Sequence, residues 1–339
     1  MHESQDFSHS PTRIFGAFAI ALLTAMLVAA VLSPPVQWLL HAIWGTHERL
    51  QLHRIFNRIV ELFALALLGW LMARLGLFRR GILGFERPWT LFARRVGIGL
   101  LVGITLMTLA AIPLFALDLR TWNPSRMPEG TLALLFFALK SIRIGLVIAL
   151  VEETLFRGGM QGALEQQGAR RAALFAIAAL YAAVHFFGET TVVPDDQVTP
   201  LSGFVVLSGF FSLLRDPPHI WDAFIALYAV GVLLGLARRR TGGIATCIGL
   251  HAGFVAVITM LRRISIATPD ERWGFLVGEF DGLLGLWIAA FAGGIFVLIW
   301  WAGRAGRKTQ TAVNQPPEAR NSNRSRRSDG AKNTKALPC

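Results

Sequence analysis

Two adjacent glutamates, Glu152 and Glu153, stand within a long apolar run of the sequence. Charged groups in hydrocarbon are unfavourable by about 2.5–3.5 kcal/mol each, so they commonly mark a reaction site or a relay. Glu153 and Arg157 are four residues apart, which is the spacing of an ion pair on one helical face. Glu152 points about 100° away around the same helix and has no local partner. We therefore expect Glu153 and Arg157 to support the site and Glu152 to carry chemistry.

Two histidines, His185 and His251, are predicted to approach Glu152. If the runs around Glu152 and His185 form an antiparallel hairpin that turns near residues 167–168, both side chains lie about 25 Å from the turn. His251 follows Arg240 by eleven residues, which places it about 16 Å into its own helix. The three depths agree if the hairpin projects beyond the membrane face, so we expect the three side chains to converge.

A carboxylate and two imidazoles in a water-poor site can hydrolyse an amide in two ways. They can bind a divalent metal that activates water, or the glutamate can take a proton from water while the histidines stabilise the carbonyl oxygen. The spacing is not a zinc signature such as HExxH, and a structural polar network is the alternative. Cys247, one turn before His251, is a weaker candidate nucleophile because a thiol buried among apolar groups is inert.

The composition is that of a membrane protein. Of the 339 residues, 54% are hydrophobic and 16% are charged, whereas a soluble domain is about a quarter charged. This predicts an all-α polytopic membrane protein. The net charge of +12 comes largely from the C-terminal tail and from loops on one side, so we attribute it to membrane orientation and not to nucleic-acid binding.

Eight apolar runs are long enough to be membrane spans, since about 20 residues cross a bilayer. They cover residues 14–32, 59–77, 96–117, 132–156, 172–187, 220–237, 243–261 and 282–302. We expect Pro34-Pro35 to end the first span, and 203–214 to be too short to cross. The distribution of lysine and arginine predicts that both termini are cytoplasmic. The predicted organisation is a polar N-terminus (1–13), a membrane domain (14–303) with its catalytic core at about 130–260, and a basic, disordered tail (304–339).

Three short motifs carry a resemblance to a known family. Glu152-Glu-Thr-Leu-Phe-Arg157-Gly matches the EExxxRG element of the CAAX-processing and bacteriocin-processing (CPBP) intramembrane proteases, which include the Abi proteins and the type II CAAX prenyl endopeptidases. Tyr181-Ala-Ala-Val-His185 resembles the family's FxxxH, with tyrosine in place of phenylalanine. His251-Ala-Gly-Phe-Val255 resembles its HxxxN or HxxxD, with valine in place of the polar residue. The resemblance covers about residues 130–260.

The resemblance implies an intramembrane endopeptidase, metal- or glutamate-dependent, whose cavity opens toward the cytoplasm. Glu152 would activate a water, and His185 and His251 would hold that water, a zinc-like divalent ion or the oxyanion. Glu153, Arg157 and Tyr181 would support them. The substrate would be a peptide or protein, with prenylated peptides the family's best-known class, and the location would be the bacterial inner membrane.

Two alternatives remain open. Val255 lacks the hydrogen-bonding group expected at its position, so the chain would also suit a non-catalytic immunity or adaptor protein that keeps the family scaffold. A proton-coupled transporter would use Glu152 and His185 as a relay. The sequence has no inverted repeat, which disfavours the transporter.

Overall fold

The computed structural model describes residues 10–187, 191–212, 220–268, 272–278, 280 and 282–313. Its helices are α1 (Pro11–Trp44), α2 (Leu52–Arg74), α3 (Arg80–Leu83), α4 (Trp89–Ala116), α5 (Gly130–Glu153), the π-helix η3 (Thr154–Gln161), α6 (Gly162–Gln166), α7 (Arg170–Val184), α8 (Ser202–Phe210), α10 (Trp221–Thr241), α11 (Ala245–Ile264) and α12 (Leu286–Val313). Short 3₁₀ turns cover Glu48–Leu50, Pro124–Arg126, Asp195–Gln197 and Gly274–Leu276. The strands β1 (Arg120–Trp122) and β2 (Ser265–Ala267) pair antiparallel.

The protein is an all-α polytopic membrane protein, as the composition predicted. Six helical segments are long and apolar enough to cross a membrane: Thr12–Trp44, Leu52–Arg74, Trp89–Ala116, Gly130–Gln166, Trp221–Thr241 and Ala245–Ile264. The other two predicted spans correspond to α7 and to the apolar part of α12, Leu286–Trp301, which are shorter. The count of eight and the cytoplasmic termini stay predictions. Helix α12 runs to Val313, and the rest of the predicted tail, 314–339, lies outside the described residues.

The prediction that Pro34-Pro35 ends the first helix is wrong. Helix α1 continues through both prolines to Trp44. A proline inside a helix removes a backbone hydrogen bond and clashes with the preceding turn. Here α1 is held from outside, because Ala29 and Ala30, one turn before the prolines, are buried in a cluster with Phe56 of α2 and Val206 of α8. Tertiary packing therefore overrides the local helix-breaking signal.

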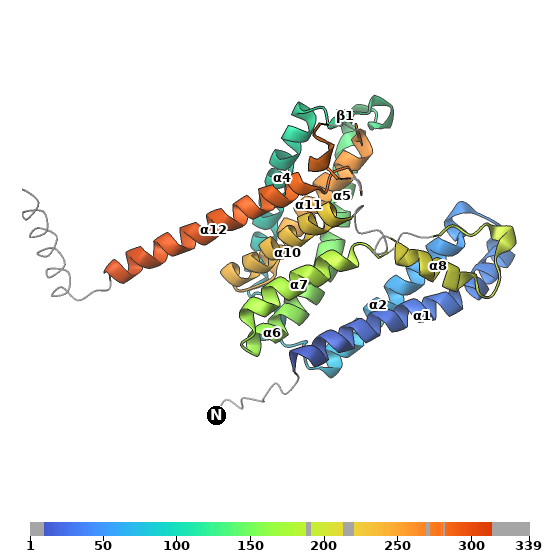
Figure 1. Cartoon of the computed structure of the whole chain (residues 1–339), viewed down its shortest axis with the longest axis horizontal. Helices are drawn as coiled ribbons and strands as arrows, with labels where there is room; N and C mark the ends of the chain where they lie inside the picture. The colour runs from blue at the N-terminus through green and yellow to red at the C-terminus, as the bar shows by residue number, and fades with distance from the viewer. Residues whose placement is uncertain are drawn as a thin grey trace, which may run out of the picture. The chain divides into compact units, whose positions relative to one another are not determined.

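The central bundle consists of α4, α5, α7, α10 and α11. Helix α11 packs against α4, α5 and α10, and α7 packs against α10 (Figure 1). The contact between α11 and α4 is backbone to backbone, since a Cβ atom at Gly249 would overlap the main chain of Val96, Gly99 and Leu100. This close packing fixes the depth of His251, which lies two residues after Gly249.

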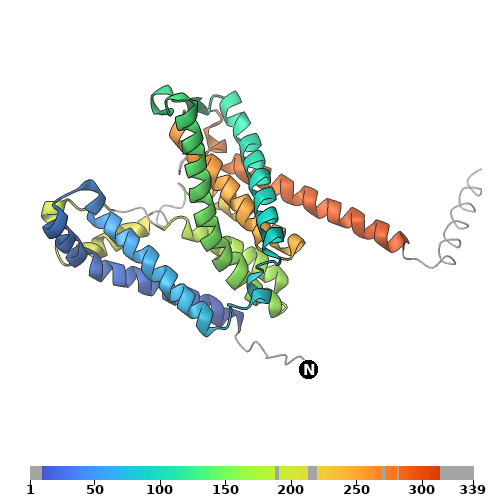
Figure 2. The same ribbon diagram turned by 180° about the vertical axis from the view of Figure 1, so that it is seen from behind.

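A second group of helices, α1, α2 and α8, has its own apolar core. Buried residues from all three helices form it: Met26, Ala29, Ala30, Leu52, Phe56, Val60 and Val206. Figure 2 shows α1 and α2 side by side as an antiparallel pair. The Gln37 amide joins this pair to the loop after α7, because its Nε2 donates to Asp195 Oδ1 at 2.9 Å and to the Leu50 carbonyl at 3.1 Å.

The hairpin that was expected to bring Glu152 and His185 to one level is present. Helix α6 ends at Gln166 and α7 begins at Arg170. Between them Gly168 adopts a φ of 80°, a left-handed conformation that glycine tolerates because it has no Cβ. The predicted turn at residues 167–168 is therefore confirmed, and α5–η3–α6 runs antiparallel to α7.

Candidate active site

The two glutamates lie where a regular helix changes into a wider one. Helix α5 ends at Glu153, and the next eight residues, Thr154–Gln161, form a π-helix. Such turns are rare and occur frequently at functional sites. Neighbouring side chains hold the widened segment: Arg238 donates to the Arg157 carbonyl, and Gln161 Nε2 donates to the Gly235 carbonyl at 3.2 Å. Our sequence reasoning missed this feature, for which the adjacent Gly158 and Gly159 are the local signal.

Glu153 is the fixed anchor of the site. Its Oε1 accepts a hydrogen bond from Arg157 Nη1 at 3.0 Å and another from His251 Nδ1 at 2.8 Å. The Glu153–Arg157 ion pair predicted from the spacing is confirmed, and both side chains are almost completely buried. The bond to His251 was not predicted, since it joins residues from α5 and α11 that no local pattern relates.

The bond to Glu153 determines how His251 faces Glu152. Because the paired carboxylate accepts, we assign the hydrogen of a neutral His251 ring to Nδ1, which leaves a lone pair on Nε2. His251 Nε2 lies 3.9 Å from Glu152 Oε2. That separation is too long for a hydrogen bond and is one that a water molecule bridges. Within the described residues, Glu152 Oε2 has no hydrogen-bond partner.

His185 has the same tautomer for a parallel reason. Its Nδ1 lies 2.7 Å from the backbone carbonyl oxygen of Tyr181. A carbonyl can only accept, so Nδ1 carries the hydrogen and Nε2 of the neutral ring has the lone pair. The imidazole packs against the ring of Tyr181, which also adjoins His251. The sequence also allows His185 to pair with Glu189, four residues further on. Glu189 lies outside the described part of the chain.

Tyr181 stands between the other members of the site. Its ring centroid is 4.5 Å from that of His185 and 5.9 Å from that of His251. The Arg157 guanidinium carbon lies over the tyrosine ring, 4.3 Å from its centroid. The structure thus brings together all six residues selected from the sequence: Glu152, Glu153, Arg157, Tyr181, His185 and His251.

The two remaining sequence candidates occupy different settings. Cys247 is buried, and its Sγ lies 3.3 Å from the Leu234 carbonyl of α10, to which the thiol donates. Val255 lies one turn after His251 on α11 and presents only carbon atoms. The structure therefore gives Cys247 a structural contact, and Val255 supplies no polar group.

The comparison with protein families covers the part of the chain that forms this site. Residues 133–257 match the family model described as type II CAAX prenyl endopeptidase Rce1-like. This segment of the chain is similar to that family. The match begins in α5 and ends in α11, so α1, α2, α4 and α12 lie outside it. Comparison with curated proteins and with solved structures gave no match.

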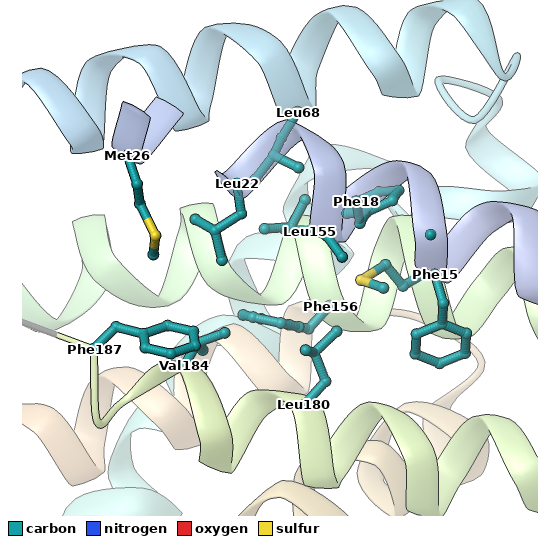
Figure 3. A pocket seen from close by; sticks show the side chains of 13 residues that line it. Phe15, Phe18, Leu22, Met26, Leu68, Leu155, Phe156, Leu180, Val184 and Phe187 are labelled. Atoms are coloured by element: carbon teal, nitrogen blue, oxygen red, sulfur yellow. The ribbon is translucent and has the colours of Figure 1, made fainter. Parts of the chain in front are cut away.

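The matched family is one of proteases. In this chain, the site adjoins an apolar groove. The groove encloses about 480 Å³. Figure 3 shows that its lining comes from α1 and α2 on one side and from η3 and α7 on the other. The residues labelled there are Phe15, Phe18, Leu22, Met26, Leu68, Leu155, Phe156, Leu180, Val184 and Phe187. Phe156 connects groove and site, because its ring also packs edge-on against Tyr181 at 5.7 Å.

Proposed function

We propose that this chain is an intramembrane endopeptidase in which Glu152 activates a water molecule. The observation that carries the proposal is the shared tautomer of the two histidines. Both Nδ1 atoms are engaged by fixed acceptors, so both neutral rings keep an Nε2 lone pair for the site. Glu152 and two Nε2 atoms provide three acceptors around one water, which can donate to two of them at a time.

The reaction follows from these groups. The water donates one hydrogen to Glu152 and one to His251 Nε2, and its oxygen attacks the peptide carbonyl carbon. Glu152 takes the proton as the new C–O bond forms. When the C–N bond breaks, Glu152 returns that proton to the leaving amine. The buried Glu153–Arg157 pair keeps His251 oriented and takes no part in the proton transfers.

A divalent metal is the alternative way to activate the water. Glu152, His185 and His251 would hold it, and it would polarise the carbonyl and activate the water. The tautomers suit this role, because a metal-binding histidine usually donates its other N–H to a carboxylate or a carbonyl. Within the described residues, however, no three His, Cys, Asp or Glu side chains are placed to hold one ion. Our proposal therefore activates the water with the side chains alone. We expect peptide cleavage to survive dialysis of the protein against a chelator. A loss of cleavage that added zinc restores would favour activation by a metal.

The groove supports a substrate that carries a hydrocarbon chain. Its walls are apolar side chains, and Phe156 lies both in the groove and against Tyr181 of the site. A chain lying there would leave an attached peptide beside Glu152. We therefore propose prenylated peptides as the substrate class.

The predicted topology would open the site toward the cytoplasm. Arg239 and Glu165 bond to each other at the tip of the hairpin, and this tip lies on the side predicted to be cytoplasmic.

The test is peptide cleavage by the purified full-length protein, with a fluorogenic farnesylated peptide as the probe. We expect Glu152→Gln and His185→Ala each to abolish cleavage, since a positioned base contributes about 10²–10⁴-fold. Glu61→Gln, on the exposed side of α2, is the matched control and keeps the wild-type rate. Thermal unfolding verifies that every variant is folded. Cleavage at the wild-type rate by Glu152→Gln would end the hydrolase proposal.

Val255 favours one second candidate, a non-catalytic immunity or adaptor protein built on the family scaffold. An adaptor needs the fold and not the base. It would keep its cellular effect in the Glu152→Gln variant, whereas a protease would lose it.

A further inference from the structure

The site contains a phenol whose polar end is unassigned in the reaction described above. Tyr181 is only 2% exposed. Within the described part of the chain, the structure gives its hydroxyl no hydrogen-bond partner. A tyrosine hydroxyl can donate one hydrogen bond, so at the centre of a reaction site it can donate to a bound substrate.

The ring of Tyr181 is held in place from several directions. The Arg157 guanidinium covers one face at 4.3 Å, an arrangement that attracts a cation to a π-system. Arg157 is itself fixed by Glu153 at 3.0 Å and by the Gly231 carbonyl at 3.3 Å. Phe156 and His185 pack edge-on against the ring. The hydroxyl is therefore preorganised, which is what a group that stabilises a transition state requires.

The other polar groups of the site leave a specific gap. Hydrolysis develops negative charge on the carbonyl oxygen, and that oxygen needs hydrogen-bond donors. The Nδ1–H groups of His185 and His251 are both engaged, and the Nε2 atoms of the neutral rings accept. The Arg157 guanidinium is turned to Glu153 and Gly231. Val255, one turn beyond His251, has no polar atom.

Tyr181 is the side chain beside these groups that still has a hydrogen to donate. Its ring centroid is 4.5 Å from that of His185 and 5.9 Å from that of His251, whose Nε2 lies 3.9 Å from Glu152 Oε2. A water held between Glu152 and His251 and a carbonyl oxygen held by Tyr181 would place the attacking and accepting groups on different sides of one carbonyl carbon.

We propose that the Tyr181 hydroxyl donates a hydrogen bond to the carbonyl oxygen of the scissile peptide and to the oxyanion formed from it. This assignment rests on the proposed peptidase function. As the water oxygen bonds to the carbonyl carbon, the π-electron pair moves onto the oxygen, and Glu152 holds the proton released by the water. The phenolic proton stays on Tyr181 throughout. When the oxyanion re-forms the carbonyl, the C–N bond breaks and Glu152 protonates the amine.

The test compares Tyr181→Phe with wild type in the farnesylated-peptide assay. The variant removes one oxygen and keeps the ring contacts, so we expect the unfolding temperature and KM to be unchanged. We expect kcat to fall about 10²-fold, as for the loss of one oxyanion donor. Tyr228→Phe, which changes the other tyrosine of the chain, is the matched control and keeps the wild-type kcat.

A second measurement distinguishes a donor from a structural side chain. A phosphinic peptide, which mimics the tetrahedral oxyanion, should bind the Tyr181→Phe variant more weakly by about the factor lost in kcat. A kcat within about twofold of wild type, or a rate loss matched by a lower unfolding temperature, would overturn the assignment. If Glu152→Gln is inactive while Tyr181→Phe cleaves normally, only this assignment fails. If Glu152→Gln cleaves normally, the proposed function itself fails.

Discussion

The α4–α11 contact of the central bundle and the α1–α2 contact of the N-terminal helices are made by different means. In the bundle, the backbones of α4 and α11 touch at Gly249, and charged side chains such as Glu153 and Arg157 are buried. Between α1 and α2, aliphatic and aromatic side chains form the contact, and the Arg58–Glu61 pair of α2 faces outward. Helix α8 differs from this pair, because a Cβ atom at its Gly203 would overlap the main chain of Ala30 in α1. Backbone contacts and buried charges tolerate little displacement, whereas apolar side chains repack.

The difference indicates a division of tasks. The bundle places His251 Nε2 3.9 Å from Glu152 Oε2. It places the Tyr181 ring centroid 4.5 Å from that of His185 and 5.9 Å from that of His251. Helices α1 and α2 lie outside the Rce1-like match and supply one wall of the groove. We infer that the bundle sets the geometry of the reaction, and that α1 and α2 set which apolar group lies beside it. Four substitutions, each with a counterpart where the chain offers one, test this comparison.

The largest effect is expected from filling the backbone contact of the bundle. Gly249→Leu would force α11 away from the main chain of α4 at Val96 and Gly99, which is unfavourable by more than about 3 kcal/mol. We expect little folded protein in detergent by size-exclusion chromatography. Gly69→Leu in α2, where a Cβ meets no atom within 4 Å, should behave like wild type. Equal yields of folded protein from both variants would show that α11 tolerates a larger side chain at its glycine as well as α2 does.

The next effect comes from breaking the same type of ion pair in each region. Arg157→Met leaves Glu153 buried without its cation, which destabilises by about 3–5 kcal/mol. Arg58→Met removes a partner from a pair whose side chains are 76% and 56% exposed, with an effect below about 1 kcal/mol. Thermal unfolding in micelles measures both. Similar unfolding temperatures for the two variants would contradict the buried role of Arg157.

A smaller and more selective effect is expected in the groove. Leu22→Trp would occupy space between α1 and η3 without touching Glu152 or the histidines. We expect the preference for a farnesylated over an unmodified peptide to fall about tenfold, which corresponds to about 1.4 kcal/mol. Leu23→Trp, on the exposed side of the same helix, is the matched control. A preference that does not respond to Leu22→Trp would place the hydrocarbon chain elsewhere.

The smallest effect is expected from Val255→Asn. It adds a polar group one turn after His251 without removing any contact of Glu152 or His185. We expect the variant to be tolerated and the cleavage rate not to fall, as measured with the same peptide. A large loss of rate would mean that the valine methyl groups are required for packing.

The sequence by itself determined the features that depend on local spacing. Long apolar runs predicted an all-α membrane protein because a bilayer demands internally satisfied backbones. The four-residue spacing predicted the Glu153–Arg157 pair, and counting residues on both sides of Gly168 predicted the hairpin. These inferences succeeded because helical geometry relates residues that are close in the chain.

Only the tertiary structure decided the rest. His251 meets Glu153 across 98 positions of sequence, so the tautomer that exposes its Nε2 to Glu152 follows from how α11 packs on α5. The π-helix after Glu153 and the passage of α1 through Pro34 and Pro35 likewise depend on neighbouring helices. The physical reason is common to all three: contacts between distant segments contribute free energies that exceed local preferences, and no spacing along the chain records them.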